Sequence, residues 1–144
     1  MLRFHQVNIV VPDLAAASHF LRSLGVDVPT LDAAWSAWEE HHLALPTADG
    51  FAADLDSSVF AARWGSLPSG FEGVVVNLRA DDRAAVDATF TDALELGAEP
   101  VRDPYDSFWG ARYAIVRGPG PIVVGIMSPT DPAMRGDGPD VADL

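Results

Sequence analysis

Short apolar runs typical of strands alternate along the chain with alanine-rich amphipathic segments typical of helices. Residues 6–13 and 75–82 are both strand-like, share the pattern Val-Asn-aliphatic, and end in an aspartate that can cap a helix. Helical stretches follow at residues 14–24 and 83–96, and a glycine stops each of them. In both stretches the apolar residues recur every three or four positions, which gives each helix one buried face. The chain therefore contains an internal repeat that begins with a strand and a helix.

Each half of the chain continues with strand-like segments. In the second half they cover residues 100–103, 111–116 and 122–127. In the first half, residues 42–45 and 51–55 predict a hairpin, and residues 26–28 are a reduced candidate for the missing strand. Residues 31–38 read as helical, and residues 57–64 predict a linking helix capped by Asp56 or Ser57. We predict two βαβββ modules, residues 1–66 and 67–130, in one structural domain, followed by a flexible acidic tail at 131–144.

The end of the second module carries the most specific pattern. Residues 108–116 read Phe-Trp-Gly-Ala-Arg-Tyr-Ala-Ile-Val, and after a turn residues 124–129 read Val-Gly-Ile-Met-Ser-Pro. With the two modules, this hairpin resembles the closing hairpin of the vicinal-oxygen-chelate superfamily of glyoxalases, bleomycin resistance proteins and extradiol dioxygenases. The turn at 117–120 departs from the family, whose turn usually reads Asp-Pro-Asp-Gly. The resemblance covers residues 3–129 and implies an α+β fold. In it, both modules form a curved mixed sheet around a central cavity, with helices on the outer face, and the protein is a homodimer.

Metal-using members of this superfamily hold a divalent ion with a histidine on the first strand and a glutamate on the last strand of each module. The resemblance places these four positions at Gln6, Val75, Asp54 and Gly125. One of them keeps a carboxylate, one has a weak amide and two have no donor, so we expect no metal and no cofactor. Strand alternation turns His5 away from the face of Gln6. We interpret the neighbouring pair at residues 41–42 as surface or capping histidines.

The composition narrows the range of partners. The formal net charge of -12 repels phosphate backbones, so we expect no nucleic acid, and it would attract a cationic small molecule, although solubility alone explains it as well. No apolar run approaches the roughly 18 residues of a membrane span. The chain has no cysteine and no basic, cleavable leader, and the cytoplasm is the expected compartment. The nine basic residues are all arginine, which excludes a Schiff-base lysine.

Several polar and aromatic side chains are candidates for a ligand site. Asn8 and Asn77 occupy equivalent strand positions and face the same side, where they either bind a ligand or bond to each other and order the core. Trp35 and Trp38 lie three residues apart, and form either a lid over the cavity or ordinary packing. Asp54 beside an aromatic wall would suit a flat cationic ligand, and burial would also let it act as a general base. The predicted ligand contacts are Gln6, Asn8, Trp35, Trp38, Asp54, Asn77, Trp109 and Tyr113.

These residues favour a metal-free protein that sequesters a small aromatic or cationic molecule, as antibiotic-resistance members of the superfamily do. The alternative is a metal-dependent lyase of the glyoxalase type or a dioxygenase, with an unfamiliar ligand set such as Asp54 with a histidine. A metal-free enzyme with Asp54 as its base is a third hypothesis.

Overall fold

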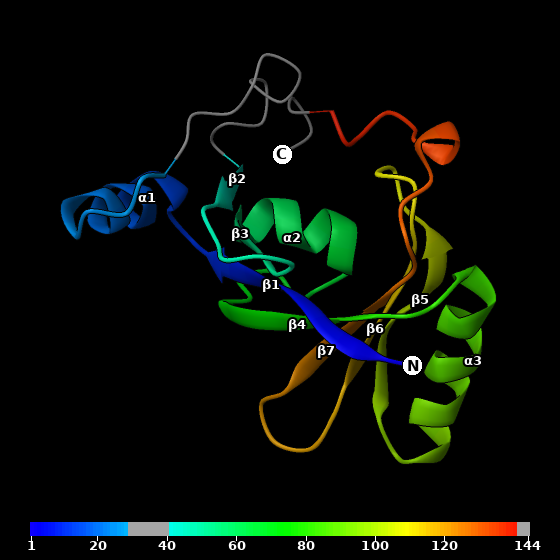
Figure 1. Ribbon diagram of the computed structural model, residues 1–144. Helices are drawn as coiled ribbons and strands as arrows, with labels where there is room; N and C mark the ends of the chain where they lie inside the picture. The colour runs from blue at the N-terminus through cyan, green and yellow to red at the C-terminus, as the bar shows by residue number, and fades with distance from the viewer. Residues whose placement is uncertain (29–40, 141–144) are drawn as a thin grey trace.

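A mixed sheet of seven strands dominates the computed structural model, which describes residues 1–28 and 41–140 (Figure 1). The strand order is β2-β3-β1-β4-β7-β6-β5, so the first three strands come from the first half of the chain and the other four from the second. The sheet curves, as the resemblance implies, and the predicted α+β class is confirmed. The strands are β1 (Arg3–Val11), β2 (His42–Leu45), β3 (Ala52–Ser57), β4 (Gly73–Arg79), β5 (Glu99–Asp106), β6 (Arg112–Arg117) and β7 (Val123–Met127).

The strand register has the symmetry expected of an internal repeat. Strands β1 and β4 pair antiparallel at the centre of the sheet, with Gln6 opposite Asn77 and Asn8 opposite Val75. Such crossed pairing is what a pseudo-twofold axis produces when Gln6 corresponds to Val75 and Asn8 to Asn77. Each of these strands also pairs in parallel with the last strand of its own module, β1 with β3 and β4 with β7.

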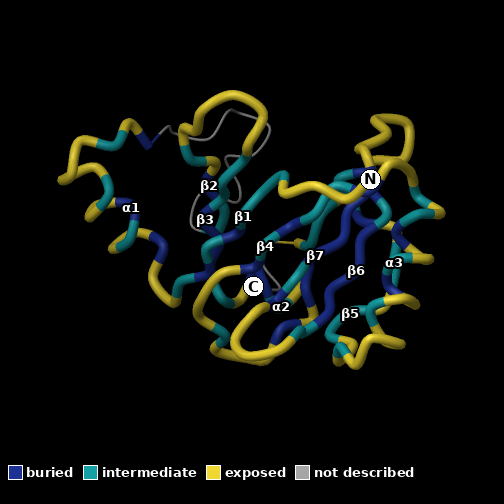
Figure 2. Tube along the Cα trace, turned by 60° about the horizontal axis from the view of Figure 1, so that its bottom comes forward, coloured by how far each residue is buried: buried dark blue, intermediate teal, exposed yellow. Residues whose placement is uncertain are grey.

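Two helices start where the repeat predicts. Helix α1 (Leu14–Ser23) is capped by Asp13 and helix α3 (Arg83–Glu95) by Asp82, and each aspartate accepts a backbone N–H three residues on. Both helices end just before a glycine with a φ near +90°. Helix α3 packs on the outer face of the sheet, with its buried side chains against β6 and β7, whereas α1 lies at the far end of the first module and is largely exposed (Figures 1 and 2).

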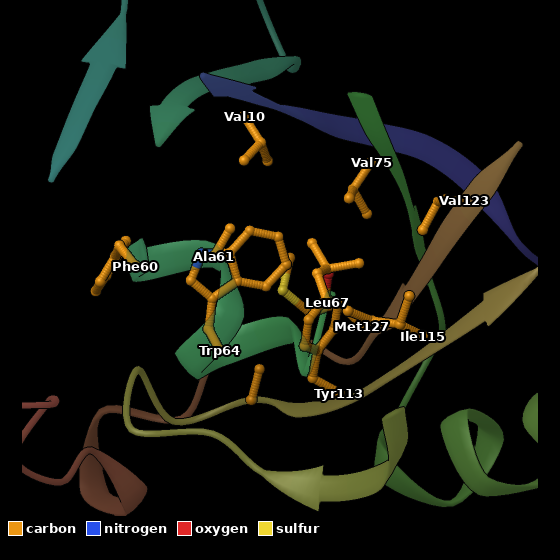
Figure 3. Packing of buried hydrophobic residues seen from close by; sticks show 11 residues of the cluster. Val10, Phe60, Ala61, Trp64, Leu67, Val75, Tyr113, Ile115, Val123 and Met127 are labelled. Atoms are coloured by element: carbon orange, nitrogen blue, oxygen red, sulfur yellow. The ribbon is translucent and has the colours of Figure 1, made fainter. Parts of the chain in front are cut away.

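The linking helix α2 (Ser58–Gly65) lies on the concave side of the sheet, and Ser57 is its cap. Figure 3 shows its side chains Ala61 and Trp64 facing apolar residues of the strands, and Phe60 belongs to the same cluster. Together these residues form a core cluster on the concave side. A cavity remains beside this cluster, and some members of the cluster line it.

The first module is less regular than the second, as predicted, although residues 26–28 form no strand. Val28 is instead buried beneath α1 with Leu14, Leu43 and Leu55. The predicted helix at 31–38 lies outside the described residues. Strand β5 runs longer than the predicted 100–103, because a register shift lets it continue to Asp106.

Residues after β7 first cross the loop between β5 and β6. The backbone N–H of Asp131 donates to the Gly110 carbonyl, and that of Gly136 donates to the Phe108 carbonyl. A short 3-10 helix, Pro132–Met134, lies between these contacts. The flexibility of the acidic tail stays a prediction. Within the described ranges, no helix has the length and apolar character needed to cross a membrane.

Candidate functional site

A cavity of about 320 Å³ lies on the concave side of the sheet, next to the core cluster. The sheet supplies its polar floor, and α2 together with the β5–β6 loop supplies an aromatic wall. Period-two alternation brings the floor residues together, because the even-numbered residues 6, 8, 54 and 56 face the same side. The lining residues are His5, Gln6, Asn8, His42, Asp54, Asp56, Phe60, Trp64, Asn77, Arg79, Phe108, Trp109, Tyr113, Met127 and Thr130.

Asp54 is the carboxylate that the sequence singled out, and it is partly buried at the cavity floor. Gln6 Nε2 donates to its Oδ2 at 2.5 Å. Burial raises the pKa of Asp54 to about 6, the charge of Asp56 adds to the shift, and the charge of His42 opposes it. Among the described residues, Asp54 forms no ion pair. Its charge is therefore free to be matched by a ligand.

Asp56 and His42 form a second polar pair beside Asp54. Their strands β2 and β3 pair with these two residues directly opposite each other. His42 Nδ1 and Asp56 Oδ1 are 2.6 Å apart, and the Asp56 side chain is fully buried. Burial alone lowers the pKa of His42, but the hydrogen bond to Asp56 and the charges of Asp56 and Asp54 outweigh it, and the pKa is raised. Two carboxylates thus lie near one imidazole, and of the two only Asp56 is hydrogen bonded to it.

The two repeated asparagines bond to each other in the middle of the floor. Asn77 Nδ2 donates to Asn8 Oδ1 at 2.7 Å, and Asn8 Nδ2 donates to Asp56 Oδ2 at 2.7 Å. The Tyr113 hydroxyl donates to Asn77 Oδ1 at 2.7 Å. Burial raises the pKa of Tyr113, so its hydroxyl keeps the proton that it donates. A chain of hydrogen bonds therefore connects His42 to Tyr113 and fixes the orientation of both amides.

The wall opposite this floor is aromatic. Phe60 and Trp64 come from α2, and Phe108 and Trp109 come from the β5–β6 loop. Phe108 and Trp109 meet edge to face with ring centroids 5.0 Å apart, and the Trp109 and Tyr113 centroids are 5.4 Å apart. Trp64 Nε1 is buried and has no hydrogen-bond partner within the described part of the chain. The wall offers ring faces and edges for stacking on a flat ligand.

His5 and Arg79 line the opposite end of the cavity, where the sequence predicted neither. The register between β1 and β4 shifts between Phe4 and Gln6, so His5 sits at a bulge. The prediction that alternation turns His5 away from the face of Gln6 is therefore wrong, because both residues line the cavity. Burial lowers the pKa of His5, and the charges of Arg79 and Arg3 lower it further. His5 is hydrogen bonded to Arg79 Nη2.

The superfamily's metal site does not fit the residues at its four positions. Val75 is fully buried in the core cluster. A Cβ at Gly125 would lie 2.0 Å from Asn77 Oδ1 and 2.5 Å from the Tyr113 hydroxyl, so these two side chains occupy the space of the second module's carboxylate. Over residues 1–28 and 41–140, no cluster of three or more histidines and acidic residues is placed to hold a metal ion.

Six of the eight predicted contact residues line the same cavity, and their role in binding stays a prediction. Trp35 and Trp38 lie outside the described residues. The sequence reasoning left out two charged residues of the floor, His42 and Asp56. The alternation Asp54-x-Asp56 could have placed Asp56 on the same face as Asp54. The predicted hairpin could have placed His42 opposite Asp56. The residues brought together are Gln6, Asn8, Asp54, Asn77, Trp109 and Tyr113.

Known protein families and solved structures share this architecture. The sequence model of the Glyoxalase/Bleomycin resistance protein/Dioxygenase superfamily matches residues 3–126. Homoprotocatechuate 2,3-dioxygenase from Arthrobacter globiformis is 19% identical with a TM-score of 0.60, over 90% of this chain and 36% of that chain. A superfamily member from Vibrio splendidus 12B01 is 15% identical with a TM-score of 0.52, over 90% of this chain and 100% of that one. Methylmalonyl-CoA epimerase from Streptomyces coelicolor is 20% identical with a TM-score of 0.50, over 90% and 98%. Curated proteins gave no match. At these identities the similarity shows the fold alone.

Proposed function

Because the chain belongs to the glyoxalase/bleomycin resistance protein/dioxygenase superfamily, yet three of its four family ligand positions hold weak or no donors, we propose that it binds a small molecule without a metal. The ligand is flat and aromatic and carries a positive charge. It lies between the polar floor and the aromatic wall of the cavity. The role is sequestration of the molecule.

The observation that carries this proposal is Asp54. Its carboxylate is partly buried at the cavity floor, and within the described residues a glutamine is its only hydrogen-bond partner. Burial disfavours the charged form of Asp54 and the charge of His42 offsets only part of that effect, so a cationic ligand would stabilise the carboxylate further. Asp56, which is paired with His42, is a second carboxylate of the same floor.

The aromatic wall supports the second part of the proposal. Rings from α2 and from the β5–β6 loop line the same cavity as the carboxylates, and cations are attracted to ring faces as well as to carboxylates. A volume of about 320 Å³ is at the lower end of the range for small-molecule sites, which suits a ligand of two or three rings.

The test compares 9-aminoacridine, a flat cation at neutral pH, with acridine, which is uncharged there, by isothermal titration calorimetry. Asp54→Asn keeps the shape of the side chain and removes its charge. We expect it to weaken 9-aminoacridine binding about tenfold or more and to change acridine binding less than twofold. Asp103→Asn is the matched control, because Asp103 is an exposed residue of β5 outside the cavity. Equal losses with D54N and D103N would overturn the proposal, as would an absence of binding to wild-type protein.

The pair of His42 and Asp56 favours a second candidate function, acid–base catalysis without a metal. Asp56 fixes Nδ1 of His42, which leaves Nε2 to take up a proton, and Asp54 with a pKa of about 6 is a second acceptor. We would incubate the protein in deuterium oxide with simple ketones and thioesters and follow loss of the α-proton by NMR. Catalysed exchange that His42→Asn abolishes would support this function, and exchange no faster than in buffer would contradict it.

We also propose that the protein is a homodimer, as the family resemblance implies. Large apolar side chains are exposed at its surface, including Phe4 at 72% and Phe20 at 61%, and a partner chain would cover such groups. Light scattering coupled to gel filtration should give about twice the 15.3 kDa mass of the chain. A mass of one chain at micromolar concentration would contradict the dimer.

A further inference from the structure

Arg79 is a cation in the cavity without an anion to match it. Within the described part of the chain its side chain has one hydrogen-bond partner, His5, and it forms no salt bridge. Its Nε is buried and has no hydrogen-bond partner there. Burial lowers the pKa of Arg79, and the nearby charge of Arg3 lowers it further. An arginine in these surroundings has unused capacity to bind an anion.

Two other arginines, unlike Arg79, form salt bridges. Arg83 pairs with Asp106, and Arg112 pairs with both Asp87 and Asp106, on the outside of the second module. The chain has 21 acidic residues for nine basic ones, so carboxylates are abundant. That none of the described carboxylates reaches Arg79 leaves its charge available to the cavity.

The surroundings of Arg79 are positive or neutral on every neighbouring strand. Arg3 lies directly opposite on β1, His5 lies beside the guanidinium, and Met127 lies opposite on β7. The imidazole of His5 accepts from the guanidinium and supplies no negative charge. The cavity therefore has a cationic end at Arg79 and an anionic end at Asp54 and Asp56.

We propose that the Arg79 end of the cavity binds the carboxylate or another planar anionic group of the ligand. This inference rests on the proposed function and narrows it: the ligand is amphoteric, with its positive group at Asp54 and its negative group at Arg79. Arginine suits a carboxylate because its planar fork of N–H groups binds both oxygens at once.

The two ends are separated along the central strands. Asp54 lies beside Asn8 of β1, and Arg79 lies beside Arg3, five residues away. At about 3.3 Å per residue this spans roughly 16 Å of strand, and the long arginine side chain shortens the gap between the charged groups. Scaffolds of one and of two rings with a charge at each end are therefore both tested.

The test uses three matched probes and their biphenyl counterparts: benzylamine, phenylacetate and 4-(aminomethyl)phenylacetate. We expect the amphoteric probe of the better length to bind about tenfold more tightly than either singly charged one. Arg79→Gln should remove the advantage of the carboxylate and leave benzylamine binding unchanged. Arg117→Gln is the control, because it removes the same charge from a residue of β6 that neither lines the cavity nor pairs with the strand of Arg79.

A second readout needs no variant. Phenylacetate bound at Arg79 offsets the guanidinium charge, so the pKa of His5, followed by NMR, should rise when the probe is added to wild-type protein. The inference is overturned if R79Q keeps the full preference for the amphoteric probe, or if phenylacetate leaves the pKa of His5 unchanged. Benzylamine binding that depends on Asp54 would still stand in that case, and so would the proposed function. If phenylacetate binds through Arg79 but no cation binds through Asp54, the proposed function fails and the anion site remains.

Discussion

At the residue scale, the two halves of the repeat differ most at Asp54 and Gly125. These positions are equivalent, because each lies beside the repeated asparagine of the neighbouring first strand. In the first half the position keeps a carboxylate that faces the cavity. In the second half it has lost its side chain, and Tyr113 fills the space and bonds to Asn77. A pseudo-symmetric scaffold has thus become an asymmetric site with its acidic groups in the first half.

Gly125 is required by this arrangement, so Gly125→Ala should be strongly destabilising. The new methyl group would overlap Asn77 and Tyr113, and a shift of either side chain breaks a buried hydrogen bond. We expect a loss of about 2–3 kcal/mol in the free energy of unfolding, measured by urea denaturation. Gly136→Ala is the control, because a Cβ there meets nothing within 4 Å. A G125A loss no larger than that of G136A would contradict the packing described.

The raised pKa of Asp54 predicts how stability depends on pH. Its folded value of about 6 lies above the reference value of 3.8, so the folded chain holds a proton that the unfolded chain has already released. The contribution of this group to stability therefore falls as the pH rises from about 4 to about 6, by roughly 2–3 kcal/mol for a shift of this size. Asp54→Asn should gain on wild type over that window in urea denaturation. Asp103→Asn should show no such gain, and a constant difference between D54N and wild type would contradict a buried Asp54.

At the element scale, the sequence predicted where strands and helices form better than it predicted strand irregularities and helix packing. Caps at Asp13 and Asp82 and glycines at both helix ends are local signals, and the structure follows them. The bulge at His5 and the position of α2 depend on contacts between distant segments. Alternation predicts a regular strand, so it assigned His5 to the wrong face. Helix α2 packs against Val10 of β1 and Val75 of β4 on the concave face, and both residues are distant from α2 in the sequence.

Helix α2 holds two rings of the cavity wall, so its cap should affect binding as well as stability. Ser57 accepts the Phe60 N–H and is 3.0 Å from His41 Nδ1. Ser57→Ala should cost about 1 kcal/mol in the free energy of unfolding and weaken 9-aminoacridine binding several-fold. Asp82→Ala removes the equivalent cap of α3, which packs on the outer face, and should cost a similar amount with unchanged binding. Equal effects of S57A and D82A on binding would show that α2 does not shape the site.

At the scale of the whole molecule, the resemblance predicted the curved sheet and the cavity, and the residues predicted part of its chemistry. Inward-facing side chains of the first strands could be identified because their alternation is regular. The cationic end at Arg79 could not be identified in this way. Whether an arginine has a carboxylate partner depends on the folded structure, and none of the described carboxylates pairs with Arg79. The protein has a net charge of -12, and its cavity has ends of opposite sign. Electrostatic forces therefore act on a ligand in two ways: at long range through the net charge, and at contact range through the cavity residues.

These two ranges can be separated with salt. The net charge draws a cation toward the protein over distances that salt screens, about 30 Å at 0.01 M and 3 Å at 1 M ionic strength. Contact with the buried carboxylate of Asp54 is screened much less. We expect the association rate of 9-aminoacridine, measured by stopped flow, to fall several-fold between 10 mM and 500 mM NaCl, and that of acridine to stay constant. The ratio of affinities between wild type and D54N should remain within about threefold over the same range. If 500 mM NaCl removes that ratio, the cation is held by the general field of the molecule, and Asp54 does not contact it in the cavity.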